Sequence, residues 1–205
     1  MRMKYLMLQS KVIHTDDTKI KMLQPGLGIC KEAKFWPYLG DWLHPYAVYD
    51  FTLDRSREGP RQFLSGYQGH LQADAYAGYD CVYAPGDVFE VACWVHARRY
   101  WYKVKDLDPD RVLMALSYIT RLFQIEDQLR DSYPVKNIQG ERDFDAIAEA
   151  RQRLSVPILE EFKPWLDEQL ESGRILPKSD LRSAFTYTLM GRVVSLHTAR
   201  LFIDG

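Results

Sequence analysis

The stretch 70–79 centres on an aspartate whose setting suits metal chemistry. It runs His-Leu-Gln-Ala-Asp-Ala-Tyr-Ala-Gly-Tyr, and the aspartate is Asp74. Leu71 and Ala73 alternate with a polar residue before it, which is the period of a short strand. Gly78 after it indicates a turn or a close approach of the backbone. We therefore expect Asp74 at the end of a strand, where its carboxylate can project into a cleft.

A second acidic stretch, 12–23, has the same strand-like pattern and contains the neighbours Asp16 and Asp17. Two strand-borne aspartates this far apart in the sequence suggest a metal site built across a sheet. Because successive side chains of a strand point to opposite faces, we expect only one of Asp16 and Asp17 in a site with Asp74. An Asp-Asp pair is also typical of a solvated hairpin turn, and the spacing leaves both interpretations open.

Basic and aromatic residues are interleaved in the stretch 87–105, whose first half is strand-like and whose second half is expected to be helical. The interleaved residues are Arg98, Arg99, Tyr100, Trp101, Tyr102, Lys103 and Lys105. They would suit a groove that meets a nucleic-acid backbone. The alternative is an amphipathic helix with aromatic side chains in the core and basic ones in solvent. Cys93 and His96 lie three apart here, but two ligands alone do not make a zinc site.

The bulk composition is that of a folded protein without a global basic field. The 205 residues are 46% hydrophobic and 13% aromatic, and the formal net charge is −1. A disordered chain is therefore excluded, and any nucleic-acid binding must depend on a local patch. No apolar run reaches the length of a membrane span. The three cysteines form no C-x-x-C pair and predict reduced, buried thiols in a cytosolic protein.

The elements that must position the aspartates are expected to be strands. Residues 34–53 are rich in aromatic and β-branched types and predict two strands broken near 40–45, a hairpin. A polar turn follows, in which Arg55 and Arg57 could contact phosphate or lie solvated. A short helix at 60–67 would then lead into the Asp74 strand.

From about residue 108 the hydrophobic period becomes helical. One helix is marked by apolar residues at 112, 116, 119 and 123, with Glu126 and Arg130 as a favourable i,i+4 pair. A second covers roughly 142–171, and Pro157 and Pro164 should kink or divide it. Ser179 is the expected N-cap of a last helix. His197 in that helix is expected to be a packing residue.

The order of these segments resembles the catalytic domain of transposases of the insertion-sequence-66 type, a DDE family. His-Thr-Asp-Asp-Thr at 14–18 is similar to the first acidic motif of the family, and the segment 63–79 to the second. Cys-Trp-Val-His-Ala-Arg-Arg at 93–99 resembles a third marker. Weaker similarities follow at 124–126, 151–157 and 176–179.

The resemblance implies a fold and a metal chemistry. The fold is α/β: a ribonuclease H-like mixed sheet flanked by helices, with a mostly helical C-terminal half. In such transposases three carboxylates hold two Mg²⁺ ions, and hard oxygen ligands suit Mg²⁺ or Mn²⁺. By position, Asp16 matches the first catalytic, metal-binding aspartate and Asp74 the second, whereas Asp17 should face away. His96, Arg98, Arg99 and Lys103 are the expected DNA-binding residues.

The third catalytic acid departs from the family pattern. It should be a glutamate in an Asn-Asn-x-x-Glu-Arg segment soon after the Asp-Gly at 204–205, and the sequence holds no such segment. The glutamates at 160, 161, 168 and 171 stand in the wrong motif context. We therefore expect a truncated catalytic domain: a sheet region at 1–105, a helical insertion at 106–175 and a C-terminal helix at 176–205.

The leading hypothesis is thus a DDE-type transposase domain acting on DNA by metal-dependent strand cleavage and transfer, and lacking its third acid. Its partners would be DNA, as transposon ends and target, and a second copy or an intact transposase. One alternative is an inactive remnant that binds DNA or pairs with a transposase. A second is a ribonuclease H-like nuclease that recruits Asp180, and a third is a stable fold with no activity.

Overall fold

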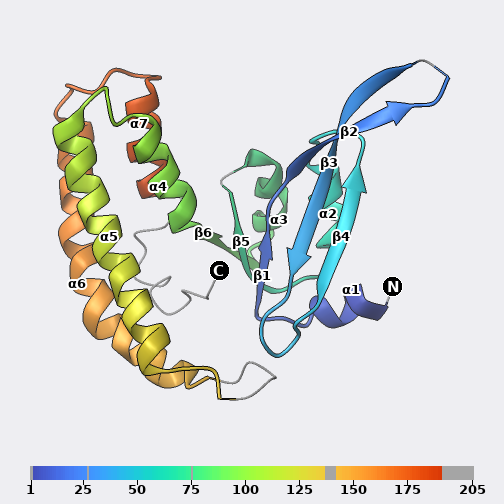
Figure 1. Cartoon of the computed structure of the whole chain (residues 1–205), viewed down its shortest axis with the longest axis horizontal. Coiled ribbons are helices and arrows are strands. Elements are labelled where there is room, and N and C mark those ends of the chain that lie inside the picture. The colour runs from blue at the N-terminus through green and yellow to red at the C-terminus, as the bar shows by residue number, and fades with distance from the viewer. Residues whose placement is uncertain (1, 27, 75, 137–141, 191–205) are drawn as a thin grey trace. The chain divides into compact units, whose positions relative to one another are not determined.

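The computed structural model describes residues 2–26, 28–74, 76–136 and 142–190 (Figure 1). The chain divides into two compact units, Met1–Glu90 and Val91–Gly205. Strands dominate the first unit and helices the second, which confirms the expected mixed α/β class with a largely helical C-terminal half. The predicted three-part division at 105 and 175 stays a prediction.

A six-stranded sheet forms the centre of the first unit. Its order is β2-β3-β1-β5-β6, and β4 pairs with β3. The strands are β1 (Val12–Thr15), β2 (Thr18–Gln24), β3 (Ile29–Leu39), β4 (Ala47–Thr52), β5 (Gly69–Ala73) and β6 (Val88–Ala92). β3 pairs antiparallel with β1, β2 and β4, and β1 pairs parallel with β5. The β3–β4 pairing confirms the predicted hairpin.

β1 and β2 both pair with β3, one after the other. Thr15 lies opposite Tyr38, and Thr18 lies opposite Phe35. The same register would place residue 16 opposite Pro37 and residue 17 opposite Trp36. Pro37 brings no backbone N–H to the ladder at this point. The two aspartates therefore occupy an interruption in one long, two-part strand.

Short helical segments complete the core of this unit. They are α1 (Arg2–Met7), α2 (Glu58–Phe63), the 3₁₀ turn η1 (Ala77–Tyr79) and α3 (Asp80–Tyr83). α2 matches the short helix predicted between the hairpin and the Asp74 strand. Alternate residues of the sheet pack with these segments in one apolar cluster, which includes Met7, Ile13, Trp36, Tyr38, Phe63, Leu71 and Tyr79. One face of the sheet is thus buried, and residues of the same parity at the strand ends point toward that side.

Four helices make up the described part of the second unit: α4 (Trp94–Lys103), α5 (Pro109–Ser132), α6 (Phe144–Glu171) and α7 (Asp180–Met190). The prolines were predicted to kink or divide the second long helix, and they do not divide it, because α6 continues through Pro157 and Pro164. A proline removes its own backbone donor, but Ile158, Phe162 and Leu166 beside these prolines are buried in the core. Their packing keeps the helix in one piece.

The helix ends follow the sequence signals. Gly173, directly after α6, has a φ of 70°, a left-handed conformation that glycine adopts without strain. The Ser179 hydroxyl accepts the backbone N–H of Arg182 at 3.1 Å, as the predicted N-cap of α7. His197 lies outside the described residues. No described helix combines the length and the apolar composition needed to cross a membrane.

The ion pair predicted within α5 was wrong. Glu126 is not bound to Arg130 but receives two hydrogen bonds from Arg151 of α6, at 2.9 and 2.6 Å. Arg130 instead pairs with Asp127 at 3.1 Å. The fork of a guanidinium matches a carboxylate in two places, so the partner on the packed helix is preferred to one on the same helix.

Candidate metal centre

Asp74 follows β5 directly, as predicted from the alternation before it. β5 runs parallel to β1, with Ile13 beside Leu71 and His14 beside Gln72. The same register, continued by two residues, brings Asp74 level with Asp16. Parallel strands end at the same edge of a sheet, so two distant acidic stretches meet at one place.

All three aspartates, Asp16, Asp17 and Asp74, belong to that place. Each offers one carboxylate oxygen, and these oxygens lie within 4.8 Å of one another. The prediction that the Asp17 side chain faces away from this place was therefore wrong, whereas the prediction that only one of the pair joins Asp74 in a metal site stays a prediction. Strict alternation holds only inside a strand, and residues 16 and 17 lie between β1 and β2.

Asp17 is held by two cations. One of its carboxylate oxygens is 2.7 Å from the ammonium of Lys34, and the other is 2.5 Å from the Arg55 guanidinium. The side chains of Lys34 and Asp17 are only 5% and 6% exposed. A carboxylate this deeply buried requires such partners, so Asp17 is fixed in position.

Asp16 is in a different setting, because it is exposed. Its Oδ1 accepts the backbone N–H of Asp17 at 2.8 Å. Among the described residues, no basic side chain lies within ion-pair distance of it. Asp16 thus presents its carboxylate to solvent at the same edge of the sheet where both carboxylate oxygens of Asp17 are paired with cations.

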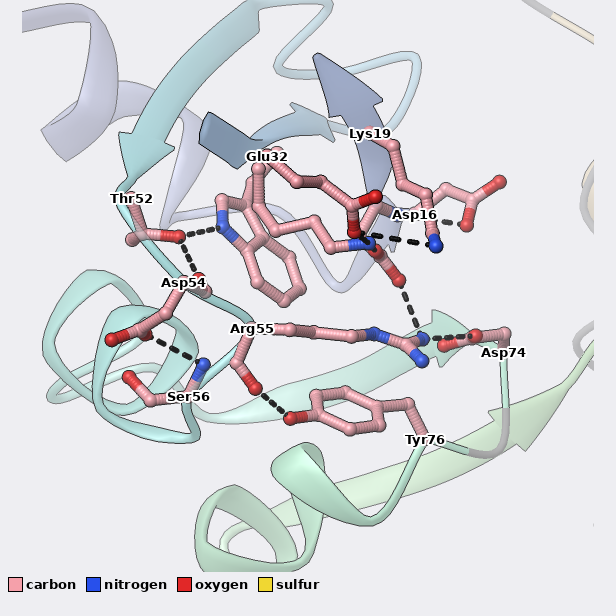
Figure 2. Close-up of polar contacts among 12 residues, drawn as sticks. Asp16, Lys19, Glu32, Thr52, Asp54, Arg55, Ser56, Asp74 and Tyr76 are labelled. Atoms are coloured by element: carbon pink, nitrogen blue, oxygen red, sulfur yellow. Dashed lines mark hydrogen bonds and ion pairs between the residues drawn. The ribbon is translucent and has the colours of Figure 1, made fainter. Parts of the chain in front are cut away.

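Arg55 connects Asp17 to Asp74 (Figure 2). Its Nη2 is 2.9 Å from Asp74 Oδ2, and its guanidinium carbon lies 3.8 Å from the centre of the Tyr76 ring. The Tyr76 hydroxyl donates a hydrogen bond to the Arg55 carbonyl. Burial by itself lowers the pKa of Arg55, but the charges of Asp17 and Asp74 outweigh it and raise that pKa. The bridge between the two aspartates therefore stays charged.

The donor set fits a hard divalent cation. Asp16 and Asp74 supply carboxylate oxygens from adjacent parallel strands, and both side chains are partly accessible. Mg²⁺ binds through one or two protein carboxylates and keeps several waters. The cluster offers no sulfur or imidazole ligand, so its chemistry suits Mg²⁺ or Mn²⁺ better than zinc.

The predicted DNA-binding residues lie on α4, in the second unit. Arg98, Arg99 and Lys103 are exposed, and Lys103 pairs with Asp180 of α7 at 3.2 Å. Trp101 is buried, and its indole N–H donates to the Thr188 hydroxyl at 2.9 Å. α4 is therefore an amphipathic helix with a packed side and a basic side, as in the alternative interpretation, and DNA binding by its basic side stays a prediction.

His96 is half-buried and acts on Cys93 at the start of α4. Burial by itself raises the pKa of the Cys93 thiol, but hydrogen bonding and charge from His96 outweigh it, so the pKa is lowered. All three cysteines are free, as predicted, but none is fully buried: Cys30 is exposed, and Cys81 and Cys93 are half-buried.

Comparison with known proteins places these features in a family. The model described as "Transposase IS66 family" matches residues 1–197. The chain belongs to this family. Its curated relatives include three uncharacterized proteins of Sinorhizobium fredii (strain NBRC 101917 / NGR234), and no solved structure gives a significant match.

The relatives are similar to this chain over most of its length. Protein y4qI is 28% identical over 198 residues, which is 88% of this chain and 34% of the relative. Protein y4jD is 29% identical over 191 residues, or 86% of this chain and 35% of the relative. Protein y4hP is 27% identical over 180 residues. The chain thus spans about a third of the length of these relatives.

Sequence reasoning did not place three residues in the centre: Lys34, Arg55 and Tyr76. Lys34 carried a usable signal, because it shares the parity of Trp36 and Tyr38 on the buried face of β3. A lysine on a buried face needs a carboxylate partner. Tyr76 carried no such signal, since a tyrosine in a turn has many possible partners.

Proposed function

We propose that this chain supplies the aspartate-bearing part of a DDE-type transposase catalytic domain, which acts on DNA by metal-dependent strand cleavage and transfer. The observation that carries the proposal is the meeting of Asp16 and Asp74 at the ends of adjacent parallel strands in an IS66-family chain. A mixed sheet with helices packed on it supports a ribonuclease H-like fold.

In this proposal Asp16 and Asp74 hold the divalent cation, Mg²⁺ or Mn²⁺. In the two-metal chemistry that the family implies, one such cation would supply activation of a water or a DNA 3′-hydroxyl, and the other would supply stabilisation of the leaving oxygen at the scissile phosphate. Asp17 fixes the local backbone through its buried pair with Lys34. Arg55 neutralises part of the acidic charge while the two ligand carboxylates face each other.

Metal binding is the first test. Isothermal titration with Mn²⁺ should show binding to the 205-residue protein. Asp16→Asn or Asp74→Asn should each weaken the Mn²⁺ affinity by about tenfold or more, because loss of a residue that only supports a metal ligand already weakens affinity by about that factor. Asp106→Asn, at an exposed aspartate between α4 and α5, is the control and should leave binding unchanged. Equal affinity in all four proteins would reject the site.

Strand transfer is the second test. The 205 residues contain no Asn-Asn-x-x-Glu-Arg segment for a third carboxylate. We expect this polypeptide alone to bind metal but to give no useful strand transfer with Mg²⁺ or Mn²⁺ and DNA carrying transposon ends. Robust transfer that Asp16→Ala abolishes would show that two aspartates and another acid of this chain suffice.

A second candidate function is DNA binding without catalysis, and the exposed side of α4 favours it. Arg98 and Lys105 lie 5.9 and 5.8 Å from the ring of Tyr102, which is 54% exposed. Cations around an exposed ring suit a nucleic-acid backbone. Fluorescence anisotropy with duplex DNA should then show binding that weakens with salt, and Arg98→Ala with Arg99→Ala should flatten the salt slope by about 0.9 per lost phosphate contact.

A further inference from the structure

We propose that Arg55 is a positioning residue that holds the Asp74 carboxylate in the metal-free protein and releases it when the divalent cation binds. The inference rests on the proposed function, because it needs the cation at Asp16 and Asp74. It assigns to Arg55 a competition with the metal that the family chemistry does not contain.

The contacts of Arg55 place a positive charge inside the acidic cluster. A single nitrogen, Nη2, lies 2.5 Å from Asp17 and 2.9 Å from Asp74. The carboxylate oxygens of Asp16, Asp17 and Asp74 lie within 4.8 Å of one another. A cation bound to Asp16 and Asp74 would therefore stand within a few ångströms of the guanidinium, where two like charges repel strongly.

Arg55 has a place to remain after Asp74 leaves it. Asp17 holds the same nitrogen, and Asp17 is itself fixed by Lys34 at 2.7 Å. The Tyr76 ring supports the guanidinium from one side at 3.8 Å, as Figure 2 shows. Release of Asp74 thus needs only a small movement of a side chain that is 39% exposed.

The exchange also explains why Asp17 keeps two cationic partners. If Arg55 is removed, Lys34 still neutralises Asp17, and the fold of the strand junction is maintained. Asp74, in contrast, loses the Arg55 cation bound at its carboxylate. Removal of the arginine therefore acts mainly on the side of the cluster that faces the metal.

The experiment compares Mn²⁺ affinity in the DNA-free wild-type protein, Arg55→Gln and Arg57→Gln. Arg57 is an exposed arginine two residues away and serves as the matched control. Arg55→Gln should bind Mn²⁺ about tenfold more tightly than the wild type, because one repelling charge is gone. Arg57→Gln should bind as the wild type does, and circular dichroism should show all three folded.

Each outcome separates this inference from the proposed function. Tighter binding in Arg55→Gln supports it, including the case in which only that variant binds. Equal or weaker binding in Arg55→Gln, with clear binding in the wild type, overturns the inference and leaves the metal site standing. No binding in any protein rejects the metal site and the inference together.

A second measurement needs no folded variant. In ¹⁵N-labelled wild-type protein, the side-chain N–H signals of Arg55 should move when Mg²⁺ is added, whereas those of Arg57 should not. Arg55 signals that stay in place while the backbone signals of Asp16 and Asp74 shift would contradict the exchange.

Discussion

At the scale of single residues, two neighbouring aspartates have opposite surroundings. Asp16 is exposed, whereas Asp17 is buried between Lys34 and Arg55. A buried carboxylate with two cations is a structural anchor, and an exposed one beside Asp74 is suited to take up a cation. This difference follows from burial and charge.

Lys34→Ala should destabilise the protein by about 2 kcal/mol, because the buried Asp17 carboxylate loses one charged hydrogen-bond partner and keeps only Arg55. Urea unfolding followed by circular dichroism measures the change in the free energy of unfolding. Lys21→Ala, at an exposed position of β2, is the control and should stay within about 0.5 kcal/mol of the wild type. Equal stability of the two variants would contradict the anchoring role of Lys34.

Cys93 should react with iodoacetamide at a lower pH than an ordinary free thiol does, because only the thiolate reacts and His96 lowers the pKa of the Cys93 thiol. Peptide-resolved mass spectrometry across pH gives the midpoint for each cysteine. His96→Gln should move the Cys93 midpoint upward, since burial alone raises that pKa. A midpoint that is the same with and without His96 would show that the histidine does not act on the thiol.

At the scale of elements, the sequence was most informative where a feature depends only on residues within one strand or helix. Aromatic and β-branched composition predicted the β3–β4 hairpin, alternation predicted the strand before Asp74, and Ser179 predicted the start of α7. The predictions failed where a partner comes from another element. Packing holds α6 together through Pro157 and Pro164, and Glu126 binds Arg151 across two helices instead of its own neighbour.

The Glu126–Arg151 pair should join α5 to α6, and its loss tests that role. Arg151→Met should lower the free energy of unfolding by about 3 kcal/mol, because the Glu126 side chain is only 14% exposed and loses its partner. The double change to Arg151→Met with Glu126→Leu should recover most of the loss, since an apolar pair of similar size leaves no buried charge. The free energy of unfolding is measured by urea unfolding of the single and double variants. If the destabilisation came only from lost packing of the Arg151 side chain, the double variant would show no such recovery.

At the scale of the whole molecule, the two aspartate motifs could be found from the sequence, but their surroundings could not. Asp16 and Asp74 stood out because each follows or interrupts a strand-like pattern, and the register of β1 and β5 then brings them together. Lys34 and Arg55 reach the centre from a distant strand and a loop. The partners of these two residues depend on how β3 and β4 align with β1, and the local sequence does not determine that alignment.

The central claim is that Asp16 and Asp74 of this IS66-family chain hold one divalent cation. Crystals of the protein soaked in Mn²⁺ and measured at a wavelength where manganese scatters anomalously test it most directly. The account predicts an anomalous peak bonded to carboxylate oxygens of Asp16 and Asp74, with Asp17 still bound to Lys34. A peak bonded to Asp17 instead of Asp16, or an unchanged Arg55 bridge with manganese bound only elsewhere, would contradict it.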